Sequence, residues 1–207
     1  GLTDEYVTVT WSVTNNGLVA VSGSWMDHLL LPCTVGCQSD ALVVQTNFTG
    51  PLEVGEGYTR SAVVRLPSEP GQYRLRVFTD AERAVVEGAE SNNLRISAPI
   101  DVQPAYHALA WTDVDAAPNG SEIPIQGRAW LTRDTNAPAA FKPVRVQVSV
   151  KRIRRDWTVM TDANGTFQTV FTPLPTEAGR YELGADYPSL RLNPAQDAFT
   201  LLGIKAS

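Results

Sequence analysis

The 207-residue sequence lacks the features that several large function classes need. It has 17 Lys and Arg against 22 Asp and Glu, which gives a net charge of −5. Nucleic-acid binding requires a clustered basic surface, so this charge argues against nucleic acid as a partner. No apolar run approaches the roughly 20 residues of a membrane span, so we expect no membrane insertion. Because the chain opens almost directly on a strand pattern, we expect a fragment of a longer protein.

Motifs for catalysis are also missing. The sequence contains no nucleophile elbow, glycine-rich phosphate-binding loop or zinc-protease helix. Its two histidines, His28 and His107, fall in different halves and have no motif around them. Glycoside hydrolysis needs two carboxylates about 5 to 10 Å apart in a cleft, and no spacing here selects such a pair. We therefore predict that the chain is not an enzyme and has no catalytic cofactor.

The two cysteines, Cys33 and Cys37, lie close together in "PCTVGC". In an oxidising compartment they can close a small disulfide loop, which contributes roughly 2 kcal/mol in the chain-entropy model. Alternatively, the two thiols and the nearby His28 supply three of the four ligands of a structural zinc site. We predict the disulfide and keep zinc as the alternative.

Alternation with a period of two dominates the sequence. In "YVTVTWSVT" (6–14), Val and Trp alternate with Thr and Ser, as in a half-buried strand, and "VRVQVSVK" (144–151) repeats the pattern. Turn signals such as "NNG", "APNG" and "DANG" separate these runs. In "DANG" (162–165) we expect a tight turn with Gly165 at positive φ. No segment shows a helical stripe of ten or more residues, so the sequence predicts an all-β chain.

An internal repeat predicts the number of domains. "LPSEPGQYRL" begins at Leu66 and "LPTEAGRYEL" begins 108 residues later, at Leu174. A period near 100 residues in an all-β chain favours two tandem immunoglobulin-like β-sandwich domains, which we place at 1–103 and 104–207. Tyr73 and Tyr181 follow a glycine-bearing corner in the two copies. Each is predicted to form a tyrosine corner that pins the connection between the sheets.

The segment "TDAERAVVEGAESNN" (79–93) is the main candidate for a ligand site. Oxygen ligands of the kind that calcium prefers are concentrated here, which gives the hypothesis of a Ca²⁺ site at Asp80, Glu87, Glu90, Asn92 and Asn93. The spacing does not fit an EF-hand loop, however. The alternative is an acidic hairpin whose side chains bond to nearby backbone donors. We favour the hairpin, because such local bonds are common.

Five tryptophans raise the question of a sugar-stacking surface. Trp11 and Trp130 lie in strongly alternating strands and are predicted to belong to the cores. The positions of Trp25, Trp111 and Trp157 are less clearly assigned. A coplanar exposed pair, for example one with Trp25 or Trp157, would indicate carbohydrate binding. A continuous polar surface would indicate a spacer.

The first half carries five ordered motifs: "VTWSVTNNG" (9–17), "SWMDHLLL" (24–31), "LEVGEGYTRSAVVRLP" (52–67), "PGQYRLRVFTD" (70–80) and "VVEGAESNN" (85–93). Over residues 3–102 they resemble the CARDB domain, an immunoglobulin-like module named for its association with bacterial cell adhesion. The stretch from Pro32 to Asn47 departs from the family, which usually carries a different, acidic loop there. The first strand of such a domain is truncated here, which predicts an exposed edge that could pair with another module or molecule.

The second half is similar to bacterial immunoglobulin-like or carboxypeptidase-regulatory-type repeats, on "GSEIPIQGRAWL", "KPVRVQVSV", "TDANGTFQTVF" and "AGRYELGADYP". Together the resemblances imply a non-catalytic structural or adhesion module, a spacer or presenting domain of a larger secreted or cell-surface protein. The implied partners are neighbouring domains of the parent chain, with a surface protein or a glycan as further candidates. The alternative function is a carbohydrate-binding accessory domain of a multidomain extracellular enzyme.

Overall fold

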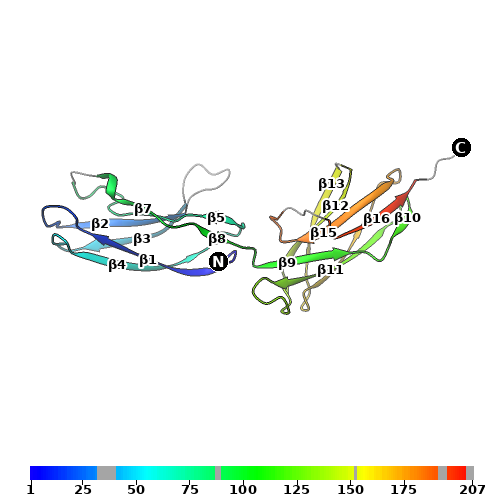
Figure 1. Cartoon of the computed structure of the whole chain (residues 1–207), viewed down its shortest axis with the longest axis horizontal. Coiled ribbons are helices and arrows are strands. Elements are labelled where there is room, and N and C mark those ends of the chain that lie inside the picture. The colour runs from blue at the N-terminus through cyan, green and yellow to red at the C-terminus, as the bar shows by residue number, and fades with distance from the viewer. Residues whose placement is uncertain (32–40, 87–89, 152, 191–194, 204–207) are drawn as a thin grey trace. The chain divides into compact units, whose positions relative to one another are not determined.

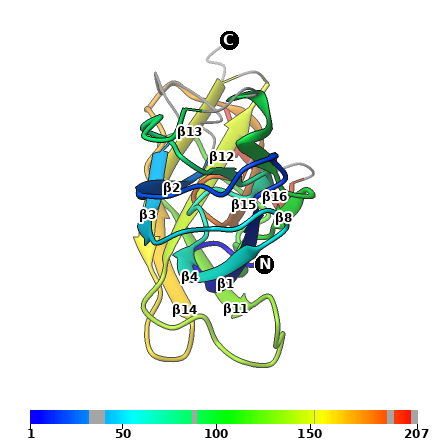
Figure 2. The same cartoon turned by 90° about the vertical axis from the view of Figure 1, so that its left-hand side faces the viewer.

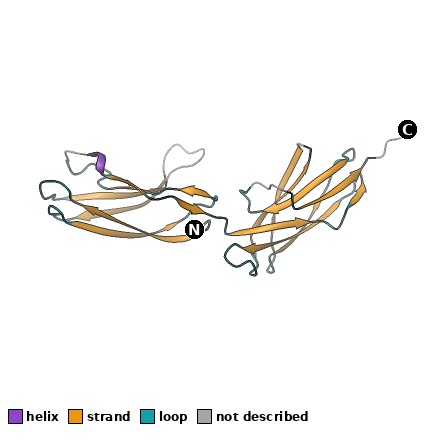
Figure 3. Ribbon diagram, viewed as in Figure 1, coloured by secondary structure: helices purple, strands orange, loops and turns teal. Residues whose placement is uncertain are grey.

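The chain divides into two compact units, residues 1–103 and 104–207. The computed structural model describes residues 1–31, 41–86, 90–151, 153–190 and 195–203. Both units are built from strands, and the one helical turn in the described part is η1 (Glu90–Asn92), drawn purple in Figure 3. No helix among these residues is long and apolar enough to cross a membrane. The predicted fold class, all-β with two tandem immunoglobulin-like sandwiches, is confirmed.

Unit 1 packs two main sheets face to face (Figure 1). One sheet pairs β1 with β4, the other has the order β3-β2-β6-β7, and the short strands β5 and β8 form a further pair. All these pairings are antiparallel. The strands are β1 (Tyr6–Thr14), β2 (Ser24–Leu31), β3 (Ala41–Thr49), β4 (Gly57–Arg65), β5 (Gly71–Tyr73), β6 (Arg76–Phe78), β7 (Leu94–Ile96) and β8 (Ile100–Val102).

The core of unit 1 follows from the period-two pattern. Trp11 lies on the inward face of β1 and packs with Leu29, Val64 and Leu75. The prediction that Trp11 belongs to the core is therefore confirmed. Next to this core, the Tyr73 hydroxyl donates a hydrogen bond of 2.8 Å to the carbonyl of Glu69, four residues upstream. This is the bond of a tyrosine corner, so unit 1 has the corner that its sequence predicts.

Unit 2 consists of a five-stranded sheet of order β10-β16-β15-β12-β13 and a three-stranded sheet of order β14-β11-β9. Strands β12 and β13 lie side by side as an antiparallel pair in both views (Figures 1 and 2). The strands are β9 (Tyr106–Trp111), β10 (Ala116–Pro118), β11 (Ile123–Leu131), β12 (Pro143–Val150), β13 (Ile153–Met160), β14 (Thr166–Phe171), β15 (Gly179–Asp186) and β16 (Asp197–Leu202).

The core of unit 2 again follows the alternation, with Val144, Val146 and Val148 buried between the sheets. Tyr181 is buried there and stacks on Phe199, with the ring centroids 5.1 Å apart. Its hydroxyl has no hydrogen-bond partner in the described part of the chain. The tyrosine-corner prediction therefore fails for Tyr181, whose ring serves the core instead.

The turn predicted at residues 162–165 is present. Gly165 has a φ of 73°, a conformation in which a side chain is strained. Asp162 accepts hydrogen bonds of 2.8 Å from the backbone N–H groups of Asn164 and Thr166. The Thr166 hydroxyl donates to the same carboxyl group, and these bonds lower the pKa of Asp162.

The prediction that Trp130 belongs to the core is wrong. In β11 the residues Ile123, Ile125 and Ala129 take the inward positions, so Trp130 lies on the outer face. There the Arg128 guanidinium lies 5.9 Å from the centroid of its ring. The inward face of β11 is set by these smaller residues rather than by the largest aromatic side chain.

The free edge of β9 is closed by side chains instead of a strand. The backbone N–H groups of Ala108, Ala110 and Thr112 donate, in that order, to the side chains of Asp186, Gln196 and Asp197. The Gln196 amide also bonds the N–H and the carbonyl of Ala185 in β15, and it donates to the carbonyl of Ala108. This one side chain therefore connects the edge strand β9 of one sheet with strand β15 of the other.

Candidate functional site

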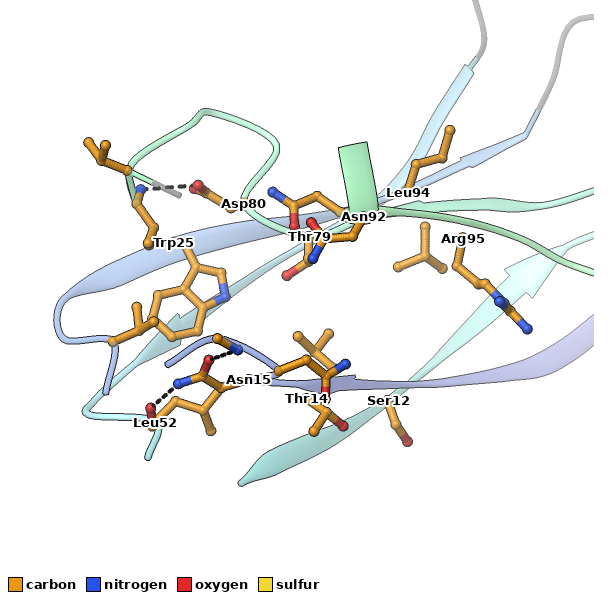
Figure 4. A pocket seen from close by; sticks show the side chains of 18 of the residues that line it. Ser12, Thr14, Asn15, Trp25, Leu52, Thr79, Asp80, Asn92, Leu94 and Arg95 are labelled. Carbon is orange, nitrogen blue, oxygen red and sulfur yellow. Dashed lines mark hydrogen bonds between the residues drawn. The ribbon is translucent and has the colours of Figure 1, made fainter. Parts of the chain in front are cut away.

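A cleft of about 920 Å³ opens at one side of unit 1. Figure 4 shows its two walls: the end of β1 and the following loop on one side, and residues from 79–86 and 92–95 on the other. The walls belong to different sheets, because β1 pairs with β4 whereas β7 pairs with β6. The cleft therefore lies between an edge strand of each sheet.

Asn15 shapes the first wall. Its side-chain amide donates to the carbonyls of Val19 and Leu52, and its side-chain oxygen accepts from the N–H of Gly17, each at 2.9 Å. These bonds hold the loop after β1 against the segment that contains Leu52, as the dashed lines in Figure 4 indicate. The turn that "NNG" (15–17) predicts thus forms a fixed edge of the cleft.

Trp25 lies between the two walls (Figure 4). Its indole N–H donates to the Tyr58 hydroxyl at 2.9 Å, and its ring packs against Phe48, which in turn stacks on Tyr58. The Arg60 guanidinium lies 5.4 Å from the centroid of the Tyr58 ring. With 5% of its surface exposed, Trp25 is part of the wall and not a stacking platform.

Behind Trp25, Asp27 is 1% exposed and forms the centre of a buried polar network. Its carboxyl group accepts hydrogen bonds from the Trp11 indole at 3.0 Å and from the Thr79 hydroxyl at 2.7 Å. The Tyr58 hydroxyl lies 2.9 and 3.0 Å from the two carboxyl oxygens. Burial raises the pKa of Tyr58 to about 12. Because Trp11 and Tyr58 come from one sheet and Asp27 from the other, the network joins the two sheets.

Three of the five residues of the calcium hypothesis, Asp80, Asn92 and Asn93, line the second wall. Asp80 is buried, and its two oxygens accept hydrogen bonds from the N–H groups of Ala84 at 2.7 Å and Val85 at 3.0 Å. Glu87 lies outside the described residues, and Glu90 begins η1. Within the described part, no three His, Cys, Asp or Glu side chains gather as a metal site would need. The structure thus assigns Asp80 a local backbone-binding role of the kind that the hairpin interpretation describes.

The other predicted residues lie elsewhere. Cys33 and Cys37 fall outside the described residues, so the disulfide stays a prediction. Trp157 is partly buried against the core of unit 2, where its indole N–H donates to the Thr169 hydroxyl at 3.0 Å. Neither Trp25 nor Trp157 therefore forms the exposed aromatic pair that would indicate carbohydrate binding.

The rim of the cleft carries exposed apolar side chains and one cation. Leu18 is 96% exposed and Val86 is 98% exposed, and both belong to the lining. Arg95 lies on the second wall and has no acidic partner within the described residues. No sequence motif contains this site, because its residues come from several segments that are distant in sequence. The signal in the sequence was a pair of apolar dipeptides, "LV" (18–19) and "VV" (85–86), outside the strand patterns.

A comparison with known families finds a match in unit 1. Residues 2–97 match the family model of the CARDB domain. That range contains every residue of the cleft lining, so the cleft is a feature of the CARDB-like part of the chain. A comparison with curated proteins gives no match.

Three solved structures illustrate the likeness to known folds. The D0–D1 domain of intimin has 16% identity, covers 98% of this chain and 91% of that chain, and has a TM-score of 0.32. An adhesin of Yersinia pseudotuberculosis, InvE, has 17% identity, 97% and 50% coverage and a TM-score of 0.36. A transglutaminase of red sea bream has 11% identity, 99% and 30% coverage and a TM-score of 0.37. Because these scores are low, the functional proposal rests on the family match and on the site.

The first prediction concerns pH and the Asp27 network. Tyrosine in an unfolded chain loses its proton near pH 10, whereas the pKa of Tyr58 is raised to about 12. Over this interval the unfolded chain has released a proton that the folded chain retains, so the stability of unit 1 falls as pH rises. We expect Tyr58→Phe to lower stability at pH 8 and to flatten its decline between pH 9 and 11, measured by urea unfolding.

Tyr6→Phe is the matched control, because Tyr6 is 68% exposed and lies outside the network. It should leave the decline unchanged. An equal decline in wild type and Tyr58→Phe would contradict the assignment of a buried, proton-retaining hydroxyl to Tyr58.

The second prediction concerns calcium. Both carboxyl oxygens of Asp80 are occupied by backbone N–H groups, so we expect the Tm to be the same in millimolar Ca²⁺ and in chelator. Thermal unfolding of the full chain measures this directly. A higher Tm with Ca²⁺ would establish the calcium hypothesis instead. In that case Glu87→Gln and Glu90→Gln would map the site.

Proposed function

We propose that the chain forms two structural or adhesive modules of a larger secreted or cell-surface protein, without chemistry of its own. The observation that carries this proposal is the match of residues 2–97 to the CARDB family model. The buried Asp27 network supports it, because hydrogen bonds from both sheets make unit 1 a well-ordered sandwich. A module that spaces or presents other domains needs this rigidity more than it needs a reactive group.

The division into modules belongs to the same proposal. Residues 1–103 form the CARDB-like sandwich, and residues 104–207 form a second bacterial immunoglobulin-like sandwich. Each has a core of its own, around Trp11 and Leu29 in unit 1 and around Val146 and Phe199 in unit 2. The partners that we propose are neighbouring domains of the parent chain and, in second place, a surface protein or a glycan. The location is extracellular or at the cell surface.

A second candidate, carbohydrate binding, has one observation in its favour. Trp111 and Trp130 both lie on the outer face of the three-stranded sheet of unit 2, on adjacent strands. Trp111 pairs with Gln126, so the two tryptophans are four residues apart, about 13 Å along the strands. Arg128 projects from the same face near the Trp130 ring. Two aromatic rings with a cation between them can stack on a polysaccharide.

The spacer role predicts independent mechanical units. We expect stretching of the full chain by force spectroscopy to give two separate unfolding events. Each event should release a length of about 350 Å, because roughly 100 residues extend by about 3.6 Å each. Asp27→Leu should weaken one event and leave the other unchanged, since Asp27 belongs to unit 1 alone. A single event that releases the whole chain would contradict two independent modules.

The carbohydrate candidate predicts binding on a polysaccharide array. If it is correct, the full chain binds and Trp111→Ala with Trp130→Ala abolishes the signal, because the stacking surface is lost. Trp157→Phe serves as the control, since Trp157 packs against the core of unit 2. If the chain binds no polysaccharide on the array, carbohydrate binding is ruled out as a candidate function and the spacer role remains.

A further inference from the structure

The three-stranded sheet of unit 2 turns one face outward. The inward positions of β11 are buried, so Gln126, Arg128 and Trp130 lie on the outer face. On the neighbouring strand β9, Trp111 pairs with Gln126. His107 pairs with Trp130, so both β9 residues share the outer face. The two tryptophans are therefore separated by about 13 Å along the strands, with Arg128 midway between them.

These two tryptophans differ from the three that serve the cores. The indole N–H groups of Trp11, Trp25 and Trp157 donate to side chains inside the fold. Trp111 and Trp130 are partly exposed and lie on a sheet face. An aromatic ring in such a place offers an apolar surface together with a polar N–H group. Two rings at the ends of one row of polar side chains suit a ligand that has both apolar and polar parts.

Arg128 places a positive charge beside one of the rings. Its side chain is exposed, and its guanidinium lies 5.9 Å from the centroid of the Trp130 ring. His107 flanks the same ring from β9, with the two ring centroids 6.4 Å apart. A guanidinium beside an aromatic ring is held by cation–π attraction and still presents its N–H groups to a carboxylate. The Trp130 end of the face is therefore suited to a negatively charged group.

The strands themselves place no acidic side chain on this face. None of the residues of β9, β11 and β14, all of which the structure describes, is Asp or Glu, and Arg128 is their one Arg or Lys. The row of Arg128 continues with Leu109 on β9 and Thr166 on β14. Gln168 of β14 lies opposite Gln126, so two amides stand side by side. The middle of the face thus combines one cation with uncharged hydrogen-bonding groups.

Two acids border the face and fix where an anion can bind. Asp113, just after β9, accepts a hydrogen bond of 2.6 Å from the Gln126 amide. Asp186 lies 3.2 Å from Nδ1 of His107. The first acid gives the end of the face near Trp111 a negative neighbour. The anionic group of a ligand is therefore expected at Arg128 and not at the Trp111 end.

We propose that this face binds a linear acidic polysaccharide, one that contains uronic acid units; the proposal rests on the carbohydrate-binding candidate and names the class of its ligand. The sugar chain lies along β11, with one ring stacked on Trp111 and another on Trp130. A carboxylate near Trp130 accepts two hydrogen bonds from the Arg128 guanidinium. Hydroxyl groups between the two stacked rings bond to the amides of Gln126 and Gln168.

A protein partner fits this face less well. The core of a protein–protein interface is depleted in charged side chains, whereas here Arg128 lies midway between the rings. A sugar ring has an apolar face bordered by hydroxyl groups, which matches aromatic rings separated by amides and a guanidinium. The net charge of −5 opposes an anion at long range. At physiological ionic strength, however, salt screens exposed charges beyond about 8 Å, so the local cation decides.

The test compares each acidic polysaccharide with its own neutral form. Polygalacturonate, alginate and hyaluronate are titrated into the full chain, each alongside its carboxyl-reduced product, which keeps the sugar backbone and loses the charge. Isothermal titration calorimetry at physiological salt measures the Kd. We expect at least one of the three to bind. Its reduced form should bind about five- to tenfold more weakly, because the charged hydrogen bonds to Arg128 are lost.

Matched variants assign the effect to Arg128. Arg128→Gln should lower the affinity for the acidic form to that for the reduced form. Arg180→Gln is the control, because Arg180 is exposed on β15 in the other sheet and its loss removes the same charge. Trp130→Ala should abolish binding of both forms, with the Tm checked for folding. Trp130→Phe keeps an aromatic ring and should retain part of the binding.

Three results would overturn the proposal. Equal affinity for the acidic and reduced forms, or an equal loss in Arg128→Gln and Arg180→Gln, would show that no carboxylate meets Arg128. Carbohydrate binding would then stand without the acidic class. No binding of any of the three polymers in either form would overturn the proposal together with the carbohydrate-binding candidate. The two failures are therefore distinguishable in one set of titrations.

Discussion

The structure of unit 1 depends on the burial of one carboxyl group. A buried carboxyl without partners is strongly unfavourable, so Asp27 is tolerated only while its hydrogen-bond donors stay in place. Trp11 in β1, Tyr58 in β4 and Thr79 after β6 supply these donors, and they come from both sheets. The separation of the sheets is therefore fixed at this point. Trp25, which lies in the cleft, is held by the same Tyr58 hydroxyl.

The two units differ in how the backbone N–H and C=O groups at an edge strand are satisfied. In unit 2 the Gln196 amide acts as a fragment of backbone and satisfies groups on both β9 and β15. Ala108, Ala110 and Ala185 are fully buried, and an unmet donor or acceptor there would cost about 1 to 3 kcal/mol. In the described part of unit 1, no side chain plays the role of Gln196 along the edge of β1.

Alternation made most of the fold predictable from the sequence. Valines at every second position, at 7 and 9 and again at 144, 146 and 148, predict strands. A period of two is the pattern of a sheet with one buried and one exposed face. Trp130 was misplaced because its size suggested the core, whereas the smaller inward residues of β11 decide which face is buried. Tyr181 shares its motif with Tyr73, yet its hydroxyl makes no corner bond. The similarity of the two motifs therefore predicts that both tyrosine rings are buried. It does not determine which group the hydroxyl bonds to.

The cleft was beyond sequence reasoning for a different reason. Its walls meet only after two sheets have packed, so no local pattern contains them. The acidic segment drew attention to Asp80 as a candidate calcium ligand, and in the structure the Asp80 carboxyl group accepts hydrogen bonds from backbone N–H groups. Its oxygens hold a loop, and the loop in turn exposes Val86 at the rim. The position of β1 connects this site to the core, because the strand that lines the cleft with Ser12 also carries Trp11.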